Sequence, residues 1–313
     1  MDARSVTLSD TSERLTATDV VMDFAGLRAL DTVSLSLAKD EIVGLIGPNG
    51  SGKTTLVNIL SGALKPSAGA VTIHGEQVTG ARPHRIARAG LVRTFQTVRL
   101  FGTMSVLENV QLGALGVGKR RREATRIAHD LIEAFDVHHL SDVTADALSY
   151  GQKRILEILR ALATGCDYLL LDEPAAGLNE EESEELLGQL SNLPSTFGCG
   201  LLIIDHDMNL IMRLCHRLHV LNQGKTIAEG TPAQVRNDPT VVEAYLGKQA
   251  SAAVVSDGGE GTVPRGDEVP VPSDDEGPVP SDDDEPPAGA EEKPQPDAGE
   301  TSLPGAVRST ESP

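Results

Sequence analysis

The chain has 313 residues, of which 39% are hydrophobic, and a formal net charge of −19 at pH 7. Such an acidic balance opposes binding to the phosphate backbone of nucleic acids. No run reaches the ~18 apolar residues of a membrane span, and no basic leader precedes an apolar segment. The sequence therefore predicts a protein that neither spans a membrane nor is secreted.

The acidic charge is concentrated at one end of the chain. Residues 249–313 contain sixteen acidic residues against three basic ones, together with eleven of the eighteen prolines. Proline lacks a backbone donor and like charges repel, so this composition cannot form a packed core. We expect one globular domain over residues 13–248, followed by a disordered, solubilising tail over 249–313. A regulated binding segment is the alternative reading of that tail.

The first predicted elements are strands. Residues 15–24 and 33–37 alternate apolar and polar side chains, and Gly26 lies near the turn between them. This alternation is typical of half-buried antiparallel strands. Residues 70–73 continue the pattern, so we expect a small antiparallel β layer.

A glycine-rich loop follows the apolar run of residues 41–46 and leads into a helical stretch. It fits the pattern G-x-x-x-x-G-K-[ST], whose backbone N–H groups surround a phosphate while the lysine contacts the β/γ-phosphates and the hydroxyl contacts Mg²⁺. The sequence thus predicts a nucleoside triphosphate site. Its residues are Gly47, Pro48, Asn49, Gly50, Ser51, Gly52, Lys53, Thr54 and Thr55.

Three later stretches carry further polar groups in chain order. Residues 91–96 read as a strand ending in Gln96, and residues 106–164 read as mostly helical. Within the helical region, Ser149 and Gly151, followed by Gln152, open a helix whose first N–H groups suit an anion.

Two continuous apolar runs, residues 168–172 and 201–205, suit parallel strands that are covered on both faces. The first ends in Asp172 and Glu173, of which the former can reach Mg²⁺ and the latter can accept a proton from an attacking water. The second is followed by His206, whose imidazole could contact a γ-phosphate. These residues predict a hydrolytic nucleotide site at the ends of the strands.

Taken together, these stretches resemble the ATP-binding subunits of ABC transporters over essentially all of residues 13–248. The resemblance implies an α/β P-loop NTPase cassette, with a mixed sheet core, an antiparallel β layer, a helical subdomain at about 97–165 and a subfamily segment at about 225–248. It implies an ATPase with ATP and Mg²⁺ as cofactors.

The resemblance also assigns roles to single residues. It makes Phe24 the adenine-stacking position, Glu173 the general base and His206 the switch histidine. The Q-loop position falls on Gln96, which becomes both a catalytic residue and a Mg²⁺ ligand with Thr54 and Asp172. The signature loop that contacts ATP comprises Ser149, Gly151 and Gln152.

A finer resemblance links the chain to the subunits that energise uptake of branched-chain and other hydrophobic amino acids. It rests on residues 148–152, on residues 173–179 and on the end of the domain from Gly230 to Gly247. Two positions depart from the general ABC pattern: Tyr150 replaces a glycine of the common signature, and Asn179 replaces an aspartate. The resemblance implies that both departures are characteristic of the subgroup.

The resemblance implies several partners. They are two membrane permease subunits, a second ABC ATPase subunit of the same or a different kind and, indirectly, an extracytoplasmic substrate-binding protein; nucleic acid is not among them. It places the permease surface in residues 97–110, around Phe101, and the chain at the cytoplasmic face of the membrane. Urea or short amides are the alternative cargo, and a soluble ABC ATPase acting on nucleic acid or ribosomes is a distant alternative.

The tail provides a first test. Deleting everything after Lys248 should leave ATP affinity unchanged, because the nucleotide motifs all precede that residue. Limited proteolysis of the full chain, followed by mass spectrometry, should remove the tail first. A tail that resists protease as well as the domain does would contradict this expectation.

Overall fold

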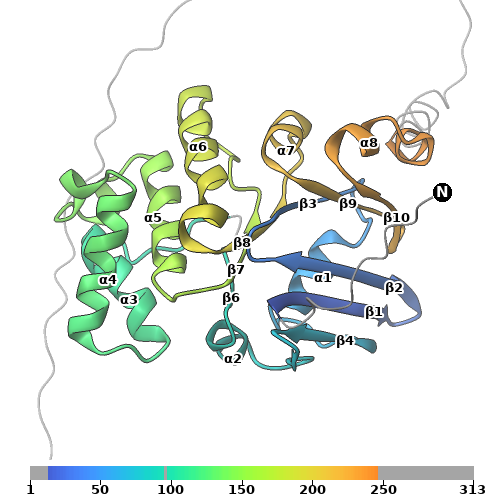
Figure 1. The fold of residues 1–313 in the computed structure, drawn as a ribbon, viewed down its shortest axis with the longest axis horizontal. Coiled ribbons are helices and arrows are strands. Elements are labelled where there is room, and N and C mark those ends of the chain that lie inside the picture. The colour runs from blue at the N-terminus through green and yellow to red at the C-terminus, as the bar shows by residue number, and fades with distance from the viewer. Residues whose placement is uncertain (1–12, 95–96, 246–313) are drawn as a thin grey trace, which may run out of the picture. The chain divides into compact units, whose positions relative to one another are not determined.

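The structure is a computed structural model that describes residues 13–94 and 97–245 (Figure 1). Gln96 and the predicted tail over 249–313 therefore lie outside the described residues. Among those described, no helix is both long enough and apolar enough to cross a membrane.

The N-terminal part of the domain forms the expected antiparallel β layer. It contains β1 (Arg14–Phe24), β2 (Leu27–Ala38), β4 (Ala68–Ile73) and β5 (Glu76–Gln77), in the order β2-β1-β4-β5. Strand β2 begins six residues earlier than the alternation suggested. The reason is a tight hairpin at Ala25 and Gly26, both with positive φ, which pairs the exposed start of β2 with the end of β1.

The second sheet has six strands in the order β10-β9-β3-β8-β7-β6. Strands β6 (Leu91–Arg93), β7 (Tyr168–Asp172), β8 (Gly200–Ile204), β3 (Ile42–Ile46) and β9 (Arg217–Asn222) are parallel, and β10 (Lys225–Gly230) pairs antiparallel with β9. The apolar runs at 168–172 and 201–205 are thus neighbouring parallel strands, as predicted. Because parallel strands share one carboxyl edge, the residues after β3, β7 and β8 meet there.

Both faces of the six-stranded sheet are covered. Alternate residues of β3 belong to different cores, since Val43 and Leu45 pack with the β layer while Ile42 and Ile46 pack with the helical side. This division explains why these strands read as continuously apolar. Helix α1 (Lys53–Leu60) packs in the core that includes the β layer.

Figure 1 labels the remaining helices, α2 to α8, in chain order. Helices α3 (Val106–Gly116), α4 (Arg121–Ala134) and α5 (Tyr150–Leu162) pack on one another as the helical subdomain. Helix α6 runs over Glu180–Phe197, and Leu193 and Pro194 in its last turns are buried against the core. The short helices are α2 (Pro83–Arg88), α7 (Met208–Leu214) and α8 (Pro232–Arg236).

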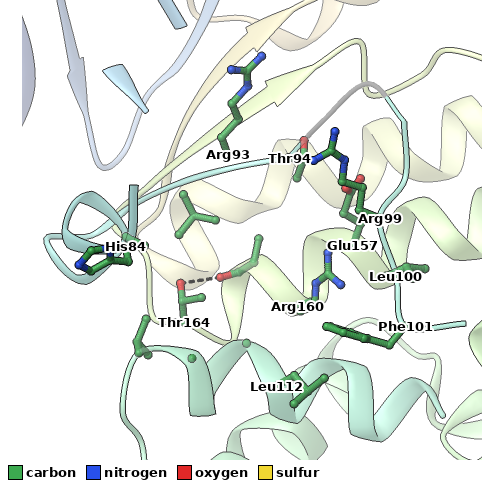
Figure 2. Close-up of a pocket in the computed structure, with 16 residues that line it drawn as sticks. His84, Arg93, Thr94, Arg99, Leu100, Phe101, Leu112, Glu157, Arg160 and Thr164 are labelled. Atoms are coloured by element: carbon green, nitrogen blue, oxygen red, sulfur yellow. Dashed lines mark hydrogen bonds between the residues drawn. The ribbon is translucent and has the colours of Figure 1, made fainter. Parts of the chain in front are cut away.

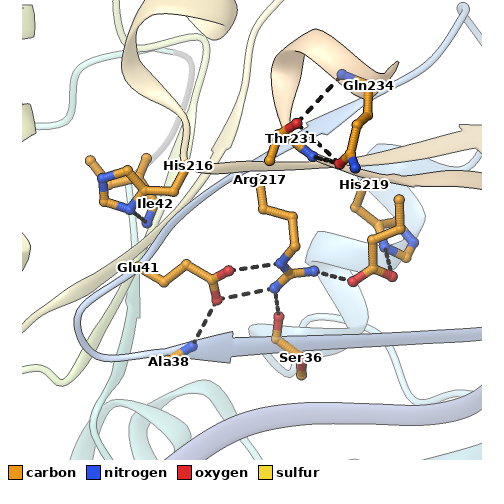
Figure 3. A network of polar contacts seen from close by, with 10 residues as sticks. Ser36, Ala38, Glu41, Ile42, His216, Arg217, His219, Thr231 and Gln234 are labelled. Carbon is orange, nitrogen blue, oxygen red and sulfur yellow. Dashed lines mark hydrogen bonds and ion pairs between the residues drawn. The ribbon is translucent and has the colours of Figure 1, made fainter. Parts of the chain in front are cut away.

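One arginine fastens the two sheets together (Figure 3). Arg217, at the start of β9, donates from Nε to Oε1 of Glu41 at 2.7 Å and from Nη2 to the carbonyl of Ser36 at 2.6 Å. It also pairs with Glu229 of β10. The guanidinium therefore joins the end of β2 to β9 and β10 of the six-stranded sheet, at the amino-terminal end of β3.

The fold class is confirmed: the chain has a mixed sheet core, an antiparallel β layer and a helical subdomain.

Candidate active site

The predicted phosphate loop lies between β3 and α1, at the carboxyl edge of the sheet. Its shape depends on glycine where the backbone meets its neighbours. At Gly47, with φ 148°, a Cβ would lie 2.0 Å from the carbonyl oxygen of Leu221. Gly52 has φ 108°, and a Cβ there would lie 2.9 Å from the carbonyl oxygen of Ala29. Neither position can accept a side chain without moving backbone.

Gly224, in the turn between β9 and β10, ties this loop to the β layer. Its N–H donates to the carbonyl of Ser51 at 2.9 Å, and its own carbonyl accepts from the N–H of Asp31 at 2.8 Å. A Cβ at Gly224 would lie 2.6 Å from the carbonyl oxygen of Ala29. No local sequence pattern predicts this residue, because its role depends on a contact between distant strands.

Inside the loop, Lys53 folds back onto the backbone. Its Nζ donates to the carbonyl of Gly47 at 2.7 Å and to that of Pro48 at 3.2 Å. The hydroxyl of Ser51 is buried and has no hydrogen-bond partner among the residues that the structure describes, whereas Thr54 is exposed on the first turn of α1. The loop thus offers a cation, N–H groups at a helix start and an unsatisfied hydroxyl, which is the donor set that phosphate oxygens require.

The C-terminal segment also reaches the loop. Tyr245 is partly buried, and burial raises the pKa of its hydroxyl, which lies within hydrogen-bonding reach of the Gly47 backbone. In the sequence this segment carries only the resemblance to the amino-acid uptake subgroup. Its contact with the phosphate loop was not predicted.

The acidic residue at the end of β7 has a cationic partner. Asp172 accepts through Oδ2 from Nη2 of Arg93 at 2.8 Å, and Nη1 of Arg93 donates to Oδ1 of Asn58 in α1 at 2.5 Å. The Arg93 side chain is only 9% exposed. This link between β6, β7 and α1 holds the carboxylate of Asp172 next to the helix that carries Thr54. Carboxylate and hydroxyl oxygens are both ligands that suit Mg²⁺.

Glu173 has an unusual backbone conformation for a non-glycine residue, with φ 48°. Its N–H donates to the carbonyl of Ile204 at 2.7 Å. Its carbonyl and that of Pro174 each accept from the guanidinium of Arg154 at 2.9 Å. These bonds over-determine a strained conformation of the kind that occurs at functional sites.

Arg154 is itself fully buried on α5. Its Nη1 forms an ion pair with Oε2 of Glu157 at 2.7 Å, so the charge that holds the Glu173 backbone is neutralised within one helix turn. A buried arginine is rare unless paired. No sequence pattern predicts its role, since the spacing of Arg154 and Glu157 is that of any helical ion pair.

His206 lies next to Glu173, as the sequence predicted for two strand ends at one edge. Its Nδ1 is 3.8 Å from Oε1 of Glu173 and 3.6 Å from Oδ1 of Asp205. The imidazole is 76% exposed, whereas Asp205 is buried, and this burial raises the pKa of its carboxyl. An exposed imidazole beside a carboxylate can turn toward a ligand at this edge.

The signature residues form the N-terminus of α5. Ser149 caps the helix by accepting from the N–H of Gln152 at 3.2 Å, and Gln152 accepts from the N–H of Ser149 at 2.9 Å. Ser149 and Gly151 also donate to the carboxylate of Glu182, in α6. An anion therefore already occupies this helix start within the chain.

Two predicted site residues are not joined to this constellation. Phe24 ends β1 in the β1–β2 hairpin and is 40% exposed, so its stacking on adenine stays a prediction. Gln96 lies outside the described residues.

Comparison with protein families gives two matches. Residues 30–176 match the model of the ABC transporter family. Residues 225–251 match the model described as branched-chain amino acid ATP-binding cassette transporter.

Individual relatives are similar over the whole cassette. The high-affinity branched-chain amino acid transport ATP-binding protein LivG of Escherichia coli is 41% identical over 249 residues, covering 75% of this chain and 98% of LivG. BraF of Pseudomonas aeruginosa, which has the same description, is 40% identical over the same shares. A crystal structure of an ABC transporter cassette in its ADP conformation has a TM-score of 0.67, 33% identity and covers 76% of this chain and all of that one.

The Arg154 bonds lead to a stability prediction. Arg154→Met should lower the free energy of unfolding by about 3–5 kcal/mol, because Glu157 would keep a buried charge without its partner. Arg126→Met, which removes an exposed arginine of α4 paired with Asp130, is the matched control and should change it by about 0.5 kcal/mol or less. Urea titration followed by circular dichroism measures both, and equal stability of the two variants would contradict the role given to Arg154.

Proposed function

The chain belongs to the ABC transporter family as one of its ATP-binding subunits, and we propose that it powers the import of branched-chain amino acids. The identity of 40–41% with LivG and BraF over the whole cassette carries this proposal. The match of residues 225–251 to the branched-chain amino acid model supports it independently. Because neither relative is described as a urea or amide transporter, that alternative cargo is not favoured.

Hydrolysis is assigned to the carboxyl edge of the six-stranded sheet. Lys53 and the loop N–H groups hold the β- and γ-phosphates. Glu173 accepts the proton of the water that attacks the γ-phosphorus, while the bond to the β–γ bridging oxygen breaks and ADP leaves. His206, 3.8 Å from Glu173, orients the γ-phosphate and the water.

Thr54 and Asp172 are the residues that would hold Mg²⁺, with Gln96 as the third predicted ligand. Mg²⁺ supplies neutralisation of the phosphate charge. Asp172 would offer this ion a carboxylate whose Oδ2 also accepts from Arg93.

ATP is proposed to lie between two cassettes. One chain provides Lys53 and Glu173, and the other provides Ser149 and Gly151 at the start of α5, whose N–H groups suit the γ-phosphate. Binding of ATP closes the pair and hydrolysis reopens it. The second cassette can be another copy or a related subunit.

A groove between the sheet and the helical subdomain fits the permease partners (Figure 2). It has a volume of about 680 Å³ and is lined from β6, α3 and α5 as well as by the segment 99–101. It does not overlap the phosphate loop, so a partner can bind there while ATP is bound. The lining is largely apolar, and its charged members are Arg93, Arg99, Glu157 and Arg160.

Phe101 is prepared for such a contact. Its ring is 54% exposed and lies 5.9 Å from the guanidinium carbon of Arg160. Its backbone is fixed, because the fully buried Asn109 accepts from its N–H and donates to its carbonyl, both at 3.0 Å. A rigid, exposed aromatic residue at the rim of a groove is typical of protein interfaces. We assign it to the permease, which places the chain at the cytoplasmic membrane face and links it only indirectly to a substrate-binding protein.

The groove generates one prediction. Phe101→Ala should lower ATPase activity of the assembled transporter, because the permease loses a contact, and leave the ATP affinity of the free chain unchanged. Val242→Ala, at an exposed position outside the groove, is the control. Reconstituted vesicles and fluorescent-nucleotide titration measure the two quantities, and an equal loss of ATP affinity would instead place Phe101 in the fold.

The shared site generates another. Lys53→Ala should weaken ATP binding about 10- to 100-fold, since a hydrogen bond to a charged group contributes roughly 1.5–3 kcal/mol. Glu173→Gln should bind ATP but lose turnover by a factor on the order of 10²–10⁴, because the amide cannot accept the proton.

Blocked hydrolysis should let the closed pair accumulate. Size-exclusion chromatography with ATP and Mg²⁺ should show Glu173→Gln eluting as a dimer, either with itself or with the related cassette of its transporter, and adding Ser149→Arg should abolish it. Full activity of Glu173→Gln would remove this residue as the base, and a dimer that ignores nucleotide would remove the shared site.

Uptake of labelled leucine against labelled urea, in cells that lack or carry the chain, tests the cargo.

A further inference from the structure

The anion site at the start of α5 is occupied by a side chain of the same protein. Oε1 of Glu182 accepts from the N–H of Gly151 at 3.3 Å and from the hydroxyl of Ser149 at 3.4 Å. The absence of a side chain at Gly151 allows this approach, because a Cβ there would lie 2.8 Å from that same oxygen. A carboxylate thus lies where the proposed function places a γ-phosphate oxygen.

The second oxygen of this carboxylate binds another helix start. Oε2 of Glu182 accepts from the N–H of Asn179 at 3.2 Å, and Asn179 caps α6 by accepting from the N–H of Glu182 at 2.9 Å. One carboxylate therefore bridges the N-termini of α5 and α6. Both ends carry partial positive charge, which favours an anion between them.

We propose that Glu182 competes, within its own chain, with the γ-phosphate of the ATP held by the second cassette. This inference rests on the shared site of the proposed function. Glu182 is a positioning residue: it holds the signature loop in place while no phosphate is present, and it has to release that loop when the pair closes.

The contacts suit an exchange. The two bonds to the signature loop are near the long limit of a hydrogen bond, and Ser149 and Tyr150 are exposed beside them. An arriving phosphate brings more charge and more acceptor oxygens to the same donors. A carboxylate and a phosphate bound to the same donors would repel each other, so only one of them can occupy the site at a time.

The exchange has two consequences. Closure requires more ATP than it would without the competing charge, and closure without nucleotide gains nothing because the donors are already satisfied. Glu182 also accepts from the N–H of Asn179, six residues after Glu173. Displacement of Glu182 therefore links the signature loop, which serves one ATP site, to the segment that follows the proposed base, which serves the other.

The first experiment measures the competition. In the full chain carrying Glu173→Gln, the ATP concentration that gives half-maximal dimer should fall about three- to tenfold when Glu182→Gln is added, because a neutral amide competes weakly with phosphate. Glutamine is also accepted at this position of a capping box, so α6 keeps its start. ATP binding by the monomer should not change.

The control is one residue away. Glu181→Gln removes the same charge from the same first turn of α6, whereas the bonds to Ser149 and Gly151 come from Glu182. Its midpoint should stay at the reference value. Equal shifts for both variants, or no shift for Glu182→Gln, would overturn the competition.

The second experiment needs no dimer. Hydrogen exchange of residues 149–152 in the isolated chain should speed up several-fold in Glu182→Ala and stay unchanged in Glu181→Ala, because only the former removes the acceptor of the Gly151 N–H. Unchanged exchange in both variants would overturn the contact. If the reference protein pairs in ATP neither with itself nor with the related cassette of its transporter, the shared site and the competition are both overturned, and the exchange result measures the contact alone.

Discussion

The site depends above all on backbone packed directly against backbone around the phosphate loop. Gly47 lies against Leu221, Gly52 against Ala29, and the Gly224 turn donates to Ser51 while it accepts from Asp31. These contacts join β3, the β2 strand of the β layer and the β9–β10 turn. A loop whose N–H groups must point inward at an anion cannot use them to hold its own shape, so the surrounding strands hold it instead.

A second constraint concerns the proposed base. Under the proposed function the carboxylate of Glu173 acts at the end of β7, yet its backbone has a conformation that non-glycine residues avoid. The buried pair of Arg154 and Glu157 compensates, because the guanidinium donates to the carbonyls of Glu173 and Pro174. Since Arg154 belongs to α5, the helix that begins with Tyr150 also positions the proposed base.

The sequence predicted the parts of this structure that have local patterns. Continuous apolar runs identified β7 and β8, alternation identified the β layer, and the spacing of glycines and Lys53 identified the phosphate loop. It did not predict Arg93, Arg154, Gly224 or Glu182, whose roles come from contacts between residues 19 to 193 positions apart in the chain. Hairpin geometry moved the start of β2, which local alternation alone did not predict.

Helix α5 connects the two proposed activities of the chain. Its first turn carries the signature residues and touches Glu182, its second turn carries Arg154 beneath Glu173, and its last turns contribute Arg160 to the groove beside Phe101. Under the proposed function, release of Glu182 at the start of α5 and binding of a permease beside Arg160 near its end would act on the same helix. Coupling between ATP and permease through α5 would be reciprocal, because each ligand changes the affinity for the other by the same factor. The bonds of Arg154 to the carbonyls of Glu173 and Pro174 would include the proposed base in that coupling.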